Sequence, residues 1–108
     1  MGLFSFLFGS GGEQTALRES IRPDAFLVDV RSAAEFSTGS VEGAVNIPLD
    51  KITTQLPKFK GKSQIVVFCR SGNRSGQAKG ILEQNGIENV INGGTWQDVK
   101  QAVSASAN

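Results

Sequence analysis

Histidine and tyrosine are absent from this chain, and cysteine occurs once, at position 69. The lack of histidine excludes Cys-His and Ser-His catalytic pairs and any histidine-ligated metal site. One cysteine cannot form an internal disulfide bond, so nothing requires an oxidising compartment and we expect a cytoplasmic protein. Any chemistry at Cys69 must therefore depend on backbone amides and on the cations of lysine or arginine.

Long hydrophobic runs and an excess of one charge sign are also missing. A formal net charge of +1 over 108 residues disfavours a nucleic-acid binder. The apolar stretch Met1–Gly9 is too short for a membrane span and lacks the basic leading segment of a signal peptide. Two interpretations of it stay open: a tail that touches a membrane or a partner, or a segment that packs on the domain or frays.

Apolar runs and helical spacings predict an α/β domain. The runs at 26–30 and 65–68 are typical of strands buried on both faces of a parallel sheet. Shorter strands are expected at 44–47 and 90–91. Helices are expected at 15–21, after the capping box of Ser32 and Glu35, at 49–56, from 73 or 75 to 84, and at 96–103. This alternation implies a four- or five-stranded, mostly parallel sheet flanked by helices on both faces.

The chain is long enough for one compact domain and offers little room for a second core. We expect residues 1–12 to be an apolar tail with a glycine-rich hinge, 13–103 to be the domain and 104–108 to be a frayed end. A fifth strand would have to come from Phe4–Phe8.

The most specific feature is the segment Cys69–Ser75, with the sequence Cys-Arg-Ser-Gly-Asn-Arg-Ser, directly after the best predicted strand. A thiol between a strand end and a helix start faces the unpaired amides and the positive dipole end of the helix. Arg70 and Arg74 add permanent charge, and Gly72 lets the loop curl so that amides converge. Such a loop lowers a thiol pKa and holds an anion beside the sulfur. The alternatives are a small buried core cysteine and two ordinary surface arginines.

Several segments in this order resemble the single-domain rhodanese family of sulfurtransferases. They are Leu27–Arg31, Glu35-Phe36 with Gly39 and Glu42–Pro48, Cys69–Ser75, and Gly93-Gly94 with Trp96. The likeness covers about residues 13–103 and implies a rhodanese-like fold. The family often has Gly-His-Ile where this chain has Gly39-Ser40-Val41, but that histidine is not the nucleophile.

The resemblance implies sulfur transfer in two halves, with no metal and no organic cofactor. Cys69 would take a sulfane sulfur from a small-molecule donor as a persulfide, and a thiophilic acceptor such as cyanide or a thiol would remove it. Arg70 resembles the thiosulfate-preferring form of the loop. Loop amides would stabilise the persulfide and the two guanidinium groups would orient a sulfonate. The implied substrate-binding residues are Arg70, Ser71, Gly72, Asn73, Arg74 and Ser75.

Asp29 and Arg31 are expected to support the site rather than to react. Asp29 would orient loop amides or pair with Arg31, and a purely fold-holding role is the alternative.

Three functions stay open. The first is an enzyme, a thiosulfate:cyanide sulfurtransferase. The second is a sulfur-relay module that passes a persulfide to a partner protein with little turnover on thiosulfate. The third is a regulatory domain without catalysis, which the intact loop disfavours. A phosphatase is also disfavoured, because four residues separate Cys69 from Arg74 where related phosphatases have five.

Overall fold

Four parallel strands form the centre of the computed structural model, which describes residues 16–107 of the chain. Their spatial order is β2-β1-β3-β4, and every neighbouring pair is parallel. The strands are β1 (Phe26–Asp29), β2 (Val45–Asn46), β3 (Ile65–Cys69) and β4 (Val90–Thr95). The predicted α/β class and parallel sheet are confirmed, with four strands among the described residues. The segment Phe4–Phe8, which a fifth strand would need, lies outside them.

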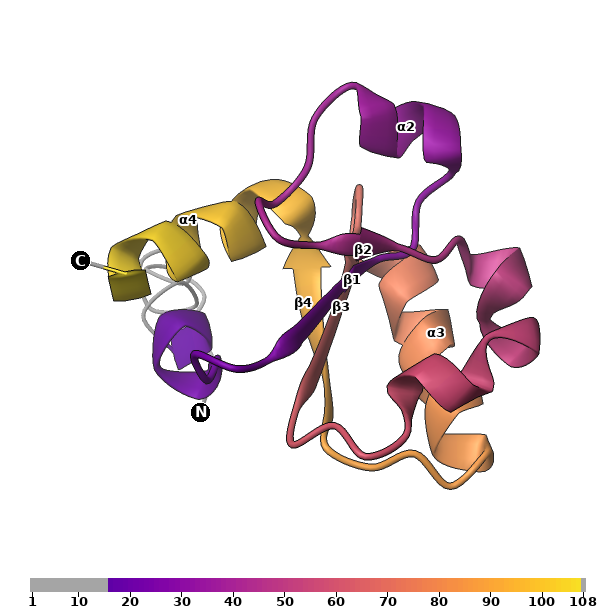
Figure 1. Cartoon of the computed structure of the whole chain (residues 1–108). Helices are drawn as coiled ribbons and strands as arrows, with labels where there is room; N and C mark the ends of the chain where they lie inside the picture. Colours follow the sequence, from indigo (N-terminus) through magenta and orange to yellow (C-terminus); the bar gives the residue numbers. More distant parts are fainter. Residues whose placement is uncertain (1–15, 108) are drawn as a thin grey trace, which may run out of the picture.

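Helices cover both faces of this sheet, as predicted (Figure 1). On one face lie α3 (Asn73–Gln84) and two short 3-10 helices, η2 (Leu49–Thr54) and η3 (Leu56–Phe59). On the other face lie α4 (Trp96–Ala107) and the helical residues 16–20. The short α2 (Ala33–Ser37) stands beyond the carboxyl ends of the strands. Within residues 16–107, no helix is long and apolar enough to cross a membrane.

β3 is the middle of the core because both of its faces are covered. All five of its side chains are buried, and they alternate between two apolar clusters. Ile65, Val67 and Cys69 belong to the cluster that includes α3, whereas Val66 and Phe68 pack with α4. Full burial of a large apolar side chain contributes about 1.5–3 kcal/mol. This alternation fixes Cys69 on the α3 face, at the carboxyl end of the sheet.

The segment predicted as one helix over 49–56 is two 3-10 helices instead. η2 ends at Thr54, and Gln55 departs from helical geometry before η3 begins. We predicted that Pro57 ends a helix. It lies instead near the start of η3, where its missing N–H is harmless. An α-helix cannot continue across Pro57, because the proline cannot bond to the carbonyl four residues back. Ile52 is nevertheless buried, as its spacing indicated.

β4 and α4 are both longer than predicted. β4 runs past 90–91 through two glycines, and its register with β3 shifts so that Gly93 is left between the paired Asn92 and Gly94. Such an extra residue is a β-bulge, and glycine is depleted in strands, which is why the pattern concealed this half of β4. α4 continues to Ala107, beyond the predicted end at residue 103.

Candidate active site

Cys69 ends β3, and the following loop curls over its sulfur. Gly72 makes this curl with a φ of 95° and directly precedes α3. A Cβ atom there would lie 3.4 Å from the Cα of Gly94 on β4, and a positive φ strains residues that carry one. The predicted place of the thiol, between a buried strand and a helix start, is confirmed. Cys69 is 0% exposed, so a donor reaches the sulfur only when loop atoms move aside.

Hydrogen-bond donors converge on the sulfur. The N–H groups of Gly72 and Ser75 donate to Sγ at 3.0 and 3.4 Å, and the Ser75 hydroxyl oxygen lies 3.5 Å away. Burial of the sulfur favours the neutral thiol. Hydrogen bonds from the Ser75 hydroxyl and from the amides of Ser75, Ser71 and Gly72 outweigh burial and lower the pKa of Cys69 to about 7. The thiolate is therefore more accessible near neutral pH than in an ordinary cysteine, without any histidine.

Asn92 on β4 forms hydrogen bonds that hold this loop in place, and it was not among the site residues predicted from the sequence. Its Nδ2 donates to the carbonyl of Gly72 at 3.2 Å, and its Oδ1 accepts from the N–H of Gly94 at 3.0 Å. These two backbone partners fix which amide atom is oxygen, so the Ser75 hydroxyl donates its hydrogen to Oδ1, at 2.7 Å, unless it turns that hydrogen toward the Cys69 sulfur. The only signal in the sequence was the position of Asn92 directly before two glycines on a strand beside β3.

Arg74 forms a bidentate ion pair with Glu35 of α2. Its Nη1 and Nη2 donate to Oε1 and Oε2 of Glu35 at 2.8 and 3.0 Å. The capping box predicted with Ser32 is present and orients the same carboxylate. The Arg74 hydrogen bond is the main cause that lowers the pKa of Glu35 to about 2, and the pair raises the pKa of Arg74 above its ordinary value. Arg74 therefore joins α2 to the start of α3, 39 residues apart in sequence, rather than standing open to an anion.

The remaining loop side chains face solvent. Arg70, Ser71 and Asn73 are exposed, and the Ser71 hydroxyl accepts a long bond of 3.4 Å from the N–H of Asn73. Among the described residues, Arg70 makes no ion pair. Its guanidinium is thus the loop cation that remains available to an incoming anion.

Asp29 and Arg31 pair with each other at the end of β1. Arg31 Nε donates to both carboxylate oxygens at 2.9 and 3.1 Å, and Nη2 donates at 2.7 Å, with Asp29 fully buried. Ser40, at the position where the family often has histidine, donates to Asp29 at 2.6 Å. The guanidinium also lies over the ring of Trp96, 5.0 Å from its centroid. Within residues 16–107 no hydrogen bond joins Asp29 to an amide of the 70–75 loop. Asp29 therefore pairs with Arg31, and does not orient the loop amides, the other contact that we considered.

Comparison with known proteins agrees with this architecture. A protein named sulfurtransferase from Allochromatium vinosum is 34% identical over 80 residues, which cover 74% of this chain and 75% of that protein. Thiosulfate sulfurtransferase PspE from Escherichia coli is 37% identical over 76 residues, covering 67% and 71%. A solved structure, a rhodanese with anions from E. coli, has a TM-score of 0.64 at 33% identity and covers 68% of this chain and 89% of that one. The family model described as the rhodanese-like domain matches residues 13–100, and the chain belongs to that family.

Proposed function

We propose that this chain is a sulfurtransferase that moves a sulfane sulfur from thiosulfate to a thiophilic acceptor through a persulfide of Cys69. The observation that supports it most is a cysteine with a pKa of about 7 whose sulfur accepts the amide hydrogens of Gly72 and Ser75. The two relatives at 34% and 37% identity are named sulfurtransferase and thiosulfate sulfurtransferase. A reaction that needs a free thiol fits a reducing compartment such as the cytoplasm.

In the first half-reaction, the Cys69 thiolate attacks the outer sulfur of thiosulfate. A new S–S bond forms, the S–S bond of thiosulfate breaks, and sulfite leaves with its electron pair. Arg70, exposed at the mouth of the loop, would orient the sulfonate through charge-assisted hydrogen bonds. The loop amides that now hold the thiolate would then hold the negative charge of the persulfide.

In the second half-reaction, the acceptor attacks the outer sulfur of the persulfide. Cyanide would leave as thiocyanate, and the electron pair of the broken S–S bond would return to Cys69 as a thiolate. The two halves need no external oxidant or reductant, because the sulfur arrives and leaves at the same oxidation level.

The test is intact mass after incubation with thiosulfate, followed by a thiocyanate assay with cyanide. The wild-type chain should gain the mass of one sulfur atom and lose it on addition of cyanide. Cys69→Ser should do neither and serves as the matched control. A fully active Cys69→Ser variant, or a wild-type thiol that gains no sulfur from any donor, would contradict the proposal.

A sulfur-relay module is the second candidate, and the Arg74–Glu35 pair favours it. That pair engages one of the two guanidinium groups expected to hold thiosulfate. A relay module would load Cys69 faster from a persulfide on a partner protein than from thiosulfate. Comparing the two loading rates by intact mass separates the candidates.

A further inference from the structure

The charges of this nearly neutral chain are strongly segregated. Residues 51–82 contain seven of the eleven lysines and arginines and none of the ten aspartates and glutamates. The rest of the chain therefore carries four basic and ten acidic residues. A net charge of +1 conceals a positive segment that includes most of η2, all of η3 and β3, the active loop and most of α3.

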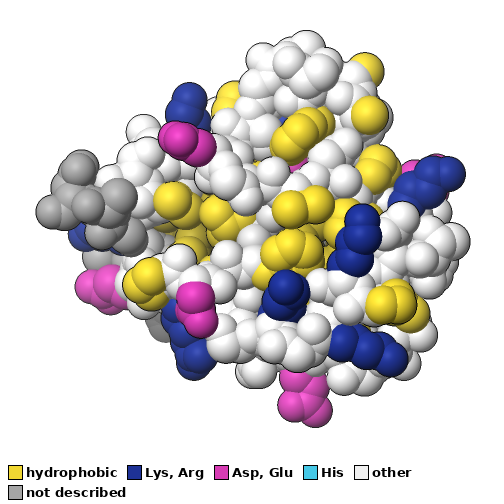
Figure 2. Space-filling model, in the orientation of Figure 1, with side chains coloured by type: hydrophobic (Ala, Val, Ile, Leu, Met, Phe, Trp, Pro, Cys, Tyr) yellow, Lys and Arg dark blue, Asp and Glu magenta, His cyan; other side chains and the backbone are white. Residues whose placement is uncertain are grey.

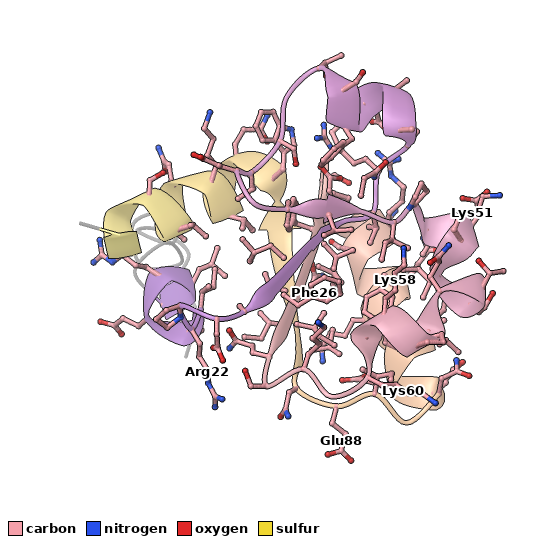
Figure 3. The ribbon with its side chains drawn as sticks, in the orientation of Figure 1. Arg22, Phe26, Lys51, Lys58, Lys60 and Glu88 are labelled. Carbon is pink, nitrogen blue, oxygen red and sulfur yellow. The ribbon has the colours of Figure 1, made fainter. Side chains whose placement is uncertain are left out.

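Four of these lysines form what we call the lysine face: Lys51, Lys58, Lys60 and Lys62. All four are exposed, and within residues 16–107 none of them makes an ion pair. Three of them are labelled in Figure 3: Lys51 on η2, Lys58 on η3 and Lys60 directly after η3. They lie on the side of the molecule where Phe26 is also labelled. Figure 2 shows Lys and Arg side chains around a group of hydrophobic side chains on this side, with acidic residues toward its edges.

A groove joins the lysine face to the active loop. Its volume is about 710 Å³. Of the lysine face only Lys51 lines it, next to Asp50, and Arg74 lines it from α3. Its lining includes the apolar residues Val30, directly after β1, Leu49 of η2 and Ile81 of α3. A ligand in this groove would thus contact a lysine, apolar residues and the first turn of α3.

We infer that the lysine face and this groove dock an acidic segment of a protein whose thiol accepts the sulfur from Cys69. The inference rests on the proposed function and names its acceptor. Unpaired lysines attract a segment of opposite charge and speed its encounter, and the apolar groove beside the loop suits peptide side chains. Because Lys51 and Arg74 share the groove, a segment bound there would reach the first turn of α3, directly after the active loop that covers Cys69.

RNA fits this face less well than an acidic protein does. Single-stranded RNA is held by bases that stack on open aromatic rings. The Phe26 ring is covered by the Lys62 ammonium at 4.7 Å and packs edge-on against Phe59 at 5.7 Å. The Trp96 ring lies under Arg31 and Lys100, at 5.0 and 5.9 Å. In the described part of the chain, the rings of Trp96 and Phe26 are therefore already covered by other side chains and leave no open surface for a base to stack on.

The transfer balances without another reactant. The acceptor thiolate attacks the outer sulfur of the Cys69 persulfide, a new S–S bond forms, and the persulfide bond breaks with its electron pair returning to Cys69. The acceptor leaves as a persulfide, and its thiol proton passes to solvent. A thiol attacks only as its thiolate, so docking must bring an ionised acceptor to the loop.

The probe is a short peptide with one cysteine among glutamates, and its counterpart has glutamine in place of every glutamate. Sulfur transfer from the loaded protein is followed by intact mass, and binding to the unloaded protein by fluorescence anisotropy. We expect the acidic peptide to accept sulfur about tenfold faster at low salt, with the advantage falling as salt rises. Lys58→Glu should reduce this advantage, and the matched charge change Lys100→Glu on α4 should preserve it. Lys51→Glu, Lys58→Glu and Lys60→Glu together should abolish it while Cys69 still gains sulfur from thiosulfate, which also shows that the variant is folded.

Equal rates for the two peptides, or equal effects of Lys58→Glu and Lys100→Glu, would overturn the inference. An RNA oligonucleotide that binds more tightly than the acidic peptide would overturn it too. Failure of the proposed function is distinguishable: Cys69 would gain no sulfur in the loading step, while anisotropy would still report whether the acidic peptide binds.

Discussion

Replacing Asn92 by alanine should lower the pKa of Cys69, although Asn92 does not touch the sulfur. The Ser75 hydroxyl has one hydrogen, and Asn92 Oδ1 accepts it at 2.7 Å, while the sulfur lies 3.5 Å from the same oxygen. Ser75 can stabilise a thiolate only by turning this hydrogen away from Asn92. Asn92 therefore opposes ionisation of Cys69 through its competition for Ser75.

The size of the effect follows from the bond that must break. A neutral hydrogen bond contributes about 0.5–1.5 kcal/mol net, and one pKa unit corresponds to about 1.36 kcal/mol. In Asn92→Ala the thiolate gains the Ser75 hydrogen without that cost, so the pKa of Cys69 should fall below its wild-type value by up to roughly one unit. The same substitution also removes the bond to the Gly72 carbonyl. If holding Gly72 were the main role of Asn92, the loop amides would loosen and the pKa would rise.

The assay is a pH titration of the ultraviolet absorbance of the thiolate, which needs no reagent to enter the buried site. Ser75→Ala supplies the matched background, because Asn92→Ala should then no longer lower the pKa of Cys69. A rise in pKa in Asn92→Ala, or the same fall with and without the Ser75 hydroxyl, would refute the competition.

Three further predictions concern stability. The native thiol of Cys69, with a pKa of about 7, ionises at lower pH than the thiol of the unfolded chain, whose ordinary pKa is 9.0. The free energy of unfolding should therefore rise between pH 7 and 9 in the wild type and stay flat in Cys69→Ala. The stability that the Glu35–Arg74 pair supplies should be lost as pH falls from 4.5 toward about 2, the lowered pKa of Glu35, and Glu35→Gln should lack this acid-dependent loss in thermal melts. Gly93→Ala should lower the free energy of unfolding in urea by about 1–3 kcal/mol, since its Cβ would lie 2.6 Å from a methyl carbon of Val99. Gly80 lies within α3 and a Cβ there would meet no other atom, so Gly80→Ala should raise the free energy of unfolding by about 0.5–1 kcal/mol. Equal midpoints for the two glycine variants would contradict the steric argument.

Local signals in the sequence were sufficient for much of the fold. β3 is buried on both faces and therefore shows as a continuous apolar run, and β1, half-buried at Phe26 and Leu27, shows as a nearly continuous one. The capping box of Ser32 and Glu35 is present where it was predicted. The thiol lies at a strand end because β3 stops there and Gly72 turns the chain into α3. These features depend on neighbours within a few residues, which is what periodicity and capping patterns report.

The partners of the loop side chains depend on tertiary packing instead. Glu35 reaches Arg74 across 39 residues, and Asn92 reaches Ser75 across 17. No local pattern encodes either contact, because the first requires α2 to stand beyond the strands and the second requires β4 to lie beside β3. The two arginines of the loop look equivalent in the sequence, and only the packing of α2 separates the engaged Arg74 from the exposed Arg70.

The complete burial of Cys69 has a consequence for the lifetime of its cargo. A thiolate at neutral pH is the form that peroxides oxidise to sulfenic and higher acids, and an open persulfide would be stripped by any free thiol. Under the loop, both species are shielded from these side reactions until the loop yields. The opening frequency of the loop, rather than the reactivity of the sulfur, would then determine how long one sulfur atom is kept and how fast it can be delivered.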